Sequence, residues 1–415
     1  MSEVALAPAR VLAESPAPPR IPGRPLPRAS YVDPGEFTAD LETVFYPGWL
    51  FAGHSCEVAE PGQYLTFSLG TESVIVARDE AGVLRAHHNV CRHRGSRIAT
   101  ADRGTARALV CPYHQWVYGL DGQLRSARLM GDCFAVERYA LAPAAVREVA
   151  GLVFVCFDAD APSFDPAADA LQPQLHRHGL DRAKVVARHS YTVQANWKTV
   201  IENNRECYHC RGNHPEFLQS NFDLGSHGEV RANDAFERTL AEAYARWDAL
   251  GLAPEEVSFP DGAWFRVSRL PLKAGYVTES PDGRPLAPTM GTLPDSDVGS
   301  LRIIGLPNLW AHANRDYAMT TRVTPESAGV TRVDVSFLVD RDAVEGVDYE
   351  PEQVAAVWRA TSEQDWELCE NNYAGIRSRA YFPGPLSTVT ENSVEAFLAW
   401  FDSRRRTAAG SSPSR

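Results

Sequence analysis

Two short pairs of cysteine and histidine constrain this chain more than any other feature. The first lies in CRHRG, residues 91–95, and the second in CPYHQW, residues 111–116. The spacing is Cys91-x-His93, then seventeen residues, then Cys111-x2-His114. Two thiolates and two imidazoles on two loops suit four-coordinate metal binding. The pairs therefore predict a small domain in which two loops meet around a metal.

This ligand set fits two kinds of metal centre. One is zinc held by two cysteines and two histidines. The other is a Rieske 2Fe-2S cluster, in which two histidines replace two cysteines on one iron. Zinc fingers favour two cysteines on one knuckle and two histidines on a following helix. Here each loop brings one of each, so both cysteines can bind one iron and both histidines the other, which favours the cluster. We expect Trp116 either to cover the cluster or to lie in the core.

The segments around these pairs predict an all-β module. Short apolar or alternating stretches such as YLTFSL (64–69), SVIVA (73–77) and GLVFVCF (151–157) are separated by Gly, Pro and Asp turns. We expect this domain to span residues 31–165. The Pro-, Ala- and Arg-rich residues 1–30 are predicted to form a flexible arm, and residues 403–415 a flexible tail.

The second half of the chain mixes strand and helix patterns and predicts an α+β domain over residues 166–402. Helices are expected over residues 197–211 and from Pro351 to about Tyr373, since proline suits a first helical turn. Long loops around a pocket are expected between residues 225 and 300. Strands are predicted at residues 185–194, 300–306, 317–323 and 330–339.

Composition excludes some classes of function. A net charge of −12 argues against a general nucleic-acid binder. No apolar run approaches the ~20 residues that span a bilayer, and the N-terminal residues lack the apolar core of a secretory signal. We therefore expect a cytoplasmic protein that acts away from membranes. The chain also lacks a Gly-rich dinucleotide fingerprint, so we do not expect it to bind a nicotinamide cofactor itself.

A second cluster of possible metal ligands lies in ENNRECYHCRGNHP, residues 202–215. If this stretch is helical, Glu206 and His209 lie three residues apart on one face. His209 and His214 are five apart, or about 140° around an ideal helix. The glycine and proline nearby indicate that the chain turns after Arg211, which would swing His214 back toward His209.

Asp365 is the candidate third ligand. It falls on the apolar stripe of the long helix predicted from Pro351, where a carboxylate without a partner would be costly. Together with His209 and His214 it would form a triad of two histidines and one carboxylate, which leaves open positions for oxygen chemistry at iron(II). Spacing alone equally allows Asp365 to be a salt-bridged acid on the helix.

Eight cysteines in a cytoplasmic chain of this length are not expected to form disulfides. On a helical model Cys207 and Cys210 point about 160° and about 100° away from His209, so both are predicted to be packing residues. The same is expected of four further cysteines: Cys56, Cys133, Cys156 and Cys369.

A Rieske motif, an E-x2-H-x4-H motif about ninety residues later and a distant Q-D-W together resemble the α subunit of Rieske non-heme iron oxygenases. The resemblance runs from about Tyr46 to Trp400. It implies an all-β Rieske domain and a catalytic domain with a helix-grip antiparallel sheet. It also implies a Rieske 2Fe-2S cluster and a mononuclear Fe(II). The implied cluster ligands are Cys91, His93, Cys111 and His114, and the implied iron ligands are His209, His214 and Asp365.

In that family an acid just before the first iron histidine bridges to a Rieske histidine of the neighbouring subunit. The resemblance gives this role to Glu206, where many members carry Asp, with His114 of the next chain as its partner. It therefore implies a homotrimer. Such a bridge would orient ligands and link the two metals.

The stretch NWKTVIENNRECYHCRGNHPEF looks most like glycine betaine and stachydrine demethylases, with choline and carnitine monooxygenases nearby. This implies an oxygenase component that takes electrons from NAD(P)H through a separate flavin- or ferredoxin-type reductase. It would use O2 to hydroxylate a C–H bond, N-demethylating a quaternary ammonium or N-methyl amino acid with release of formaldehyde.

Several other functions are open at this point. One alternative is an aromatic ring-hydroxylating dioxygenase or a secondary-metabolite hydroxylase of the same fold. Others are an electron-transfer Rieske protein without catalytic iron and a zinc-stabilised binding module. A quaternary ammonium substrate would need aromatic faces. Five residues could provide them or could equally be core: Trp264, Phe265, Tyr276, Trp310 and Tyr317.

Overall fold

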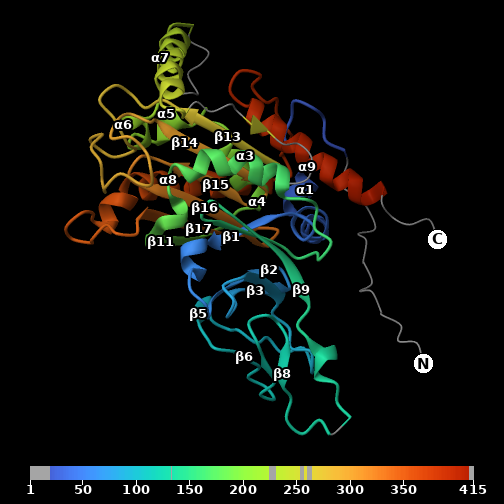
Figure 1. Ribbon diagram of the computed structural model, residues 1–415. Helices are drawn as coiled ribbons and strands as arrows, with labels where there is room; N and C mark the ends of the chain where they lie inside the picture. The colour runs from blue at the N-terminus through green and yellow to red at the C-terminus, as the bar shows by residue number, and fades with distance from the viewer. Residues whose placement is uncertain (1–18, 132, 224–229, 253–256, 259–263, 411–415) are drawn as a thin grey trace.

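The computed structural model describes residues 19–131, 133–223, 230–252, 257–258 and 264–410. Within them the chain forms two seven-stranded sheets and one three-stranded sheet, and their strands pair antiparallel. Figure 1 shows one lobe that contains β2 to β8 and a second that contains β11 to β17 with most of the helices. The fold is therefore α+β, as predicted.

The first lobe is built on the sheet of order β1-β10-β9-β4-β3-β2-β5. Along β2 the side chains of Leu65, Phe67 and Leu69 point inward and alternate with partly exposed ones, which is the period of a half-buried strand. Its strands are β1 (Leu50–His54), β2 (Gln63–Leu69), β3 (Glu72–Arg78), β4 (Leu84–His88), β5 (Arg103–Thr105), β9 (Pro143–Val149) and β10 (Leu152–Cys156). The small sheet is β6 (Leu109–Val110), β7 (Val117–Tyr118) and β8 (Leu124–Ser126).

The second lobe is built on the sheet of order β11-β17-β16-β15-β14-β13-β12. Its longest pairing joins β11 to β17, from Ala183 opposite Asp340 to Val193 opposite Thr331. Its strands are β11 (Ala183–Val193), β12 (Val257–Ser258), β13 (Trp264–Leu270), β14 (Ser300–Leu306), β15 (Leu309–Ala313), β16 (Ala318–Ser327) and β17 (Val330–Asp340). The four strands predicted in this half are all present.

The long helix α8 (Pro351–Ile376), which carries Asp365, packs on β11 and against α4 (Trp197–Asn204), the helix that precedes His209 and His214 in the chain. The other helices are α1 (Arg28–Val32), α2 (Pro34–Asp40), α3 (Asp165–His176), α5 (Cys210–Asn213), α6 (Phe217–Ser220), α7 (Val230–Ala249) and α9 (Asn392–Gly410). Single turns of other helix types are η1 (Leu41–Phe45), η2 (Ser55–Val58), η3 (Val136–Tyr139) and η4 (Leu180–Arg182).

The two lobes share one apolar core. Phe67 and Val153 of the first sheet belong to the same buried cluster as Trp197 of α4 and Phe337 of β17. The boundary predicted between residues 165 and 166 falls at the start of α3, between the last strand of the first sheet and the first strand of the second. The shared core holds the two sheets in a fixed relation.

Two predictions of secondary structure are wrong. The helix expected over residues 197–211 ends at Asn204, where asparagines favour helix ends over helix interiors. There the Glu206 carboxylate accepts the backbone N–H of Tyr208, a local bond that competes with the helix. The prediction of long loops between residues 225 and 300 is wrong in part, because the region contains the twenty-residue helix α7 and the strand β13, whereas residues 271–299 do form a long loop.

The prediction of a flexible arm over residues 1–30 and a flexible tail over residues 403–415 is wrong for the part of these segments that the structure describes. Arg20 binds Glu395 of α9 through two hydrogen bonds of 2.7 and 2.8 Å, and the side chain of Leu26 is buried. The helix α9 continues to Gly410, and its Arg405 pairs with Glu36. These ion pairs and apolar contacts offset the entropy lost on ordering. Residues 1–18 and 411–415 lie outside the described residues.

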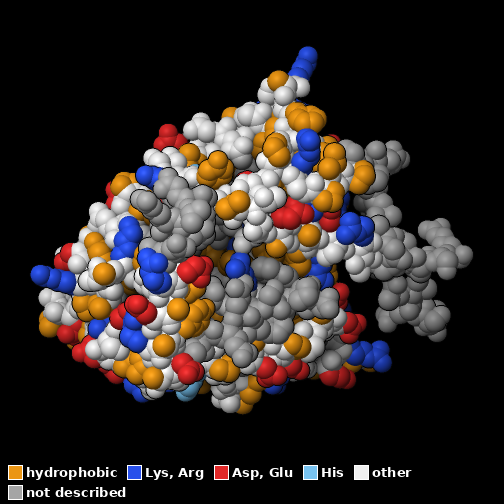
Figure 2. Space-filling view, turned by 90° about the horizontal axis from the view of Figure 1, so that it is seen from above, with side chains coloured by type: hydrophobic (Ala, Val, Ile, Leu, Met, Phe, Trp, Pro, Cys, Tyr) orange, Lys and Arg blue, Asp and Glu red, His pale blue; other side chains and the backbone are white. Residues whose placement is uncertain are grey.

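The described helices include none that is long and apolar enough to cross a membrane. Figure 2 shows the molecule from above, where basic, acidic and hydrophobic side chains are interspersed over the described part of that face. Such a mixture is typical of globular domains.

Candidate active site

The first predicted metal centre lies at the end of the first lobe, on the loop after β4 and the loop between β6 and β7. The side chains of Cys91 and Cys111 are buried and close enough to interact, whereas His93 and His114 lie at the surface. The two histidine Nδ1 atoms are 3.2 Å apart. The structure thus brings all four residues together, with the sulfurs inside and the imidazoles outside.

The two loops have the same backbone form. In each, the residue four positions after the cysteine donates its N–H to the cysteine carbonyl, Gly95 at 2.9 Å and Gln115 at 3.0 Å. Both residues have a left-handed φ, of 82° and 59°. Glycine adopts this conformation freely, whereas it costs Gln115 conformational energy. Matched loops present one cysteine and one histidine each, which fits a two-iron cluster with both histidines on the outer iron.

Two buried aromatic side chains contact the candidate ligands of this centre. Trp116 is buried and stacks on the ring of His93, with centroids 4.9 Å apart and planes 9° apart. Tyr118 Oη lies 3.3 Å from Cys91 Sγ and accepts the N–H of Arg92 at 3.0 Å. Trp116 therefore lies in the core, one of the two expectations for it, and packs on one candidate ligand, His93.

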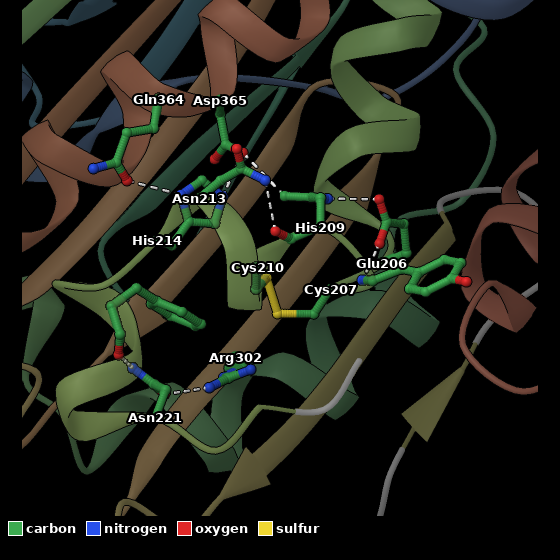
Figure 3. The surroundings of a disulfide bond; sticks show 12 residues. Glu206, Cys207, His209, Cys210, Asn213, His214, Asn221, Arg302, Gln364 and Asp365 are labelled. Atoms are coloured by element: carbon green, nitrogen blue, oxygen red, sulfur yellow. Dashed lines mark hydrogen bonds and ion pairs between the residues drawn. A yellow bond between two sulfur atoms is a disulfide. The ribbon is translucent and has the colours of Figure 1, made fainter. Parts of the chain in front are cut away.

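The second predicted centre lies between α5 and α8. His209 Nε2 and His214 Nε2 lie 3.2 and 3.0 Å from Asp365 Oδ1 (Figure 3). The short helix α5 reverses the chain, and His214 closes it by donating its backbone N–H to the carbonyl of Cys210 at 2.8 Å. The turn expected after Arg211 therefore begins earlier, and it brings His214 back to His209 as predicted.

These residues fit a metal ion. His214 Nε2 and Asp365 Oδ1 are buried, and neither makes a hydrogen bond of good geometry within the described chain. Buried polar atoms rarely lack a partner. A divalent cation held by His209, His214 and Asp365 would satisfy them and leave further positions open.

Outer contacts aim both imidazoles at Asp365. His209 Nδ1 lies 2.6 Å from Glu206 Oε1, and His214 Nδ1 lies 2.8 Å from Gln364 Oε1. Gln364 in turn donates to Glu216 at 2.9 Å. Such contacts orient metal ligands and set which nitrogen stays free. Sequence reasoning missed Gln364, although it lies directly before the candidate aspartate.

Electrostatics at the triad also favour a bound cation. Burial lowers the pKa of His209, but the neighbouring carboxylates of Asp365 and Glu206 outweigh burial and raise the pKa to about 9. Burial also lowers the pKa of His214, but the neighbouring Asp365 carboxylate outweighs burial, so the pKa of His214 is raised. Burial alone would raise the pKa of Asp365, yet the two histidines lower it. A metal ion would take the place of the protons that these shifts retain.

Cys210 is buried and Cys207 packs against the core, as predicted, but the expectation that they form no disulfide is wrong, because they are bonded to each other (Figure 3). The angles that separated them assumed a continuous helix, and the chain instead turns between them. Ligand atoms of His209, Cys210 and His214 lie within 4.8 Å of one another. The sulfur of Cys210 is bonded to Cys207 and is not a thiolate, so Asp365 is the better third ligand.

The disulfide predicts a labelling pattern. When purified protein is denatured without reductant and alkylated, Cys207 and Cys210 should stay unlabelled, whereas the free Cys133 and Cys369 should react. After reduction all four should react. Peptide mass spectrometry reads the result, and alkylation of Cys207 before reduction would contradict the pairing.

A cavity of about 400 Å³ opens onto the triad. It is lined by aromatic side chains, by the two histidines and the aspartate of the triad, and by three arginines. The aromatic residues are Phe217, Trp310 and Trp358, and the arginines are Arg205, Arg266 and Arg302. A volume of this size suits a small molecule.

Of the five aromatic candidates, Trp310 lines the cavity. Phe265 is buried in a separate core cluster, and Tyr317 is buried with its hydroxyl donating to the carbonyl of Glu279. Tyr276 is not among the cavity residues, and the side chain of Trp264 lies outside the described residues. Phe217 and Trp358 were missed, since neither lies on the strands that carried the candidates.

The two centres lie in different lobes of the molecule. The cluster loops adjoin β6 at the tip of the first lobe, and the triad adjoins α5 and α8 in the second (Figure 1). Among the described residues no side chain of the first centre contacts the second. Any electron path between them within one chain would be long.

Comparison with known proteins places these features in a family. Residues 180–406 match the family described as ring hydroxylating alpha subunit (catalytic domain), and residues 48–140 match the Rieske [2Fe-2S] domain. The glycine betaine monooxygenase oxygenase subunit of Chromohalobacter salexigens is 43% identical over 91% of this chain and 84% of its own. Its namesake from Pseudomonas aeruginosa is 40% identical over 91% and 88%.

Solved structures share the fold. The quaternary ammonium Rieske monooxygenase CntA in complex with L-carnitine superposes with a TM-score of 0.68 at 20% identity, covering 92% of this chain and 96% of that chain. Naphthalene 1,2-dioxygenase from Rhodococcus superposes with a TM-score of 0.65 at 20% identity, covering 94% and 95%. At this identity the likeness shows architecture alone.

Proposed function

The chain belongs to the ring-hydroxylating alpha subunits of the Rieske non-heme iron oxygenases, and we propose that it removes an N-methyl group from a small betaine-like substrate. It is an enzyme, the oxygenase component of a multicomponent monooxygenase system that needs a reductase. Its cofactors are a Rieske 2Fe-2S cluster and a mononuclear iron. The substrate is the part that we propose.

One observation carries the substrate proposal. Phe217, Trp310 and Trp358 line the same small cavity as His209, His214 and Asp365. A quaternary or N-methyl ammonium group binds well against aromatic faces. Relatives named for glycine betaine match most of the chain, and their names give the same substrate class.

We assign the ligands as the sequence predicted. Cys91, His93, Cys111 and His114 would hold the cluster, and His209, His214 and Asp365 the mononuclear iron. When bound, the iron supplies activation of O2 for C–H oxidation. The chain itself orients both imidazoles through Glu206 and Gln364 and holds the substrate methyl between aromatic walls near the triad.

The overall chemistry balances. With O2, two electrons and two protons, an N-methyl group becomes N-hydroxymethyl and one oxygen atom leaves as water. Loss of the hydroxyl proton then breaks the C–N bond, so that the amine keeps the bonding electron pair and formaldehyde leaves. No residue of the chain is consumed.

We further propose that three copies assemble as a cyclic trimer. The centres within one chain lie in different lobes, whereas His114 lies at the surface and is free to face a neighbour (Figure 1). Glu206 would link His209 to His114 of the partner subunit. The reductase would be of the flavin or ferredoxin type, and its use of NAD(P)H supports a cytoplasmic location.

Formaldehyde release tests the proposed reaction. With a suitable reductase, O2 and NAD(P)H, the enzyme should release formaldehyde in step with NAD(P)H oxidation when glycine betaine or related N-methyl amino acids are supplied. Heat-denatured enzyme is the control for uncoupled oxidation by the reductase. If betaines are oxidised without formaldehyde, demethylation is wrong.

A further inference from the structure

Arg205 is a buried cation without a partner. Its side chain is 5% exposed and lines the active-site cavity. Its Nε, Nη1 and Nη2 atoms are all buried, and none makes a hydrogen bond within the described residues. Arginine is almost never buried unless it is paired, because an uncompensated charge is strongly destabilising. Among the described residues this charge therefore has no counter-ion, and a group from outside them would compensate it.

A second arginine, Arg266, adds positive charge to the same cavity. Arg266 of β13 lines the same cavity and donates to Ser393 Oγ at 2.7 Å. Burial, and after it the positive charge of Arg266, lowers the pKa of Arg205 to about 9. An anion placed near both guanidinium groups would favour the charged form of Arg205.

The acids of the cavity do not compensate Arg205. Glu206 and Asp365 face the two histidines. Glu279, which is not among the residues that line the cavity, lies 4.0 Å from Arg302 and accepts from His312 at 3.0 Å. Within the described cavity residues, each carboxylate therefore already serves another cation.

An acid from a neighbouring subunit is also a poor partner. Arg205 lies next to Glu206, which we place near a subunit interface, but its side chain offers only 5% of its surface. Arg205 lines the cavity, and its guanidinium nitrogens are covered in this structure, so a small anion in the cavity reaches them through a shift of the Arg205 side chain. The missing anion should therefore be a small molecule that enters with the substrate or as part of it.

We propose that Arg205 and Arg266 form a carboxylate-binding subsite of the active-site cavity. A guanidinium donates two parallel N–H groups to one carboxylate, which fixes its position as well as its charge. A small zwitterion would place its carboxylate there and its N-methyl ammonium against the aromatic walls near the triad. This inference rests on the proposed function and narrows it to substrates that carry an anion.

The test compares two ligands that differ in one charge. Dissociation constants of the iron-loaded enzyme are measured by calorimetry for glycine betaine and for its carboxamide, which keeps the quaternary ammonium but has no carboxylate charge. Arg205→Met should weaken betaine binding about 10- to 100-fold, as expected for a lost charge-assisted hydrogen bond, and should change carboxamide binding little. Arg205→Lys should fall between. Arg284→Met, which removes a side chain that is 85% exposed, is the matched control and should change neither.

The outcomes separate the two proposals. Equal binding of betaine by wild type and Arg205→Met, or an equal loss for both ligands, would overturn the subsite. A selective loss for betaine in an enzyme that releases no formaldehyde would keep the subsite and reject the demethylation. Cluster absorption and thermal unfolding check each variant, and if Arg205→Met does not fold, Arg266→Gln provides the same comparison.

Discussion

Replacing His209 with alanine should abolish oxygenation and mononuclear iron binding while leaving the visible absorption of the cluster intact. His209 Nε2 faces Asp365 Oδ1 at 3.2 Å, and the cluster residues lie in the other lobe. Losing a ligand should lower turnover by more than about 100-fold, the upper end of what loss of an outer contact costs. Iron analysis and absorption spectra measure both parts.

His176 provides the matched control for that variant. It is an exposed histidine at the end of α3, so His176→Ala should keep iron, cluster and turnover. If His209→Ala bleaches the cluster as well, the two sites are not independent. Retained turnover would remove His209 from the iron site.

Replacing Glu206 with glutamine should keep both metal centres but slow turnover about 10- to 100-fold, as for other contacts that orient metal ligands. The carboxylate accepts from His209 Nδ1 at 2.6 Å and from the N–H of Tyr208. Glutamine has one acceptor oxygen and no charge, so it cannot hold His209 and a second imidazole in the same way. Stopped-flow oxidation of the reduced cluster, with substrate and O2 present, measures the step.

The neighbouring acid Glu363 serves as the control for Glu206. It is exposed on α8, two residues before Asp365, and Glu363→Gln should oxidise its cluster at the wild-type rate. A wild-type rate in Glu206→Gln would argue against a bridge between the centres. Loss of iron in that variant would instead make Glu206 essential for the triad itself.

Local patterns account for what the sequence could predict. The strand predicted at residues 300–306 is β14, and the helix predicted from Pro351 is α8, because alternation, turn residues and a first-turn proline are all local signals. The cluster residues were found because each pair is close in sequence. Asp365 was found because a carboxylate on an apolar stripe needs a reason to be there.

The wrong predictions came from contacts that spacing does not contain. The disulfide of Cys207 and Cys210 was missed because one assumption, a continuous helix, fixed where each side chain pointed. Arg20 and Glu395 are 375 residues apart, so the ordering of the N-terminal segment could not be seen. Arg205 looks like any charged residue until the fold buries it.

One element that was missed, the helix α7, could have been predicted from the sequence. The helix α7 carries buried Phe236, Ala243 and Trp247 at helical spacing, within a run rich in Ala, Glu and Arg. That pattern predicts an amphipathic helix. The surrounding glycines and prolines hid it, and the whole stretch was interpreted as loop.

A single turnover without reductase tests the account most directly. The enzyme is reduced under anaerobic conditions, freed of reductant and mixed with O2 and glycine betaine, and formaldehyde and cluster absorption are followed together. The account predicts that formaldehyde appears as the cluster is reoxidised, and that His209→Ala yields none. Reoxidation of the wild-type cluster without formaldehyde, with betaine or any other N-methyl amino acid, would contradict it.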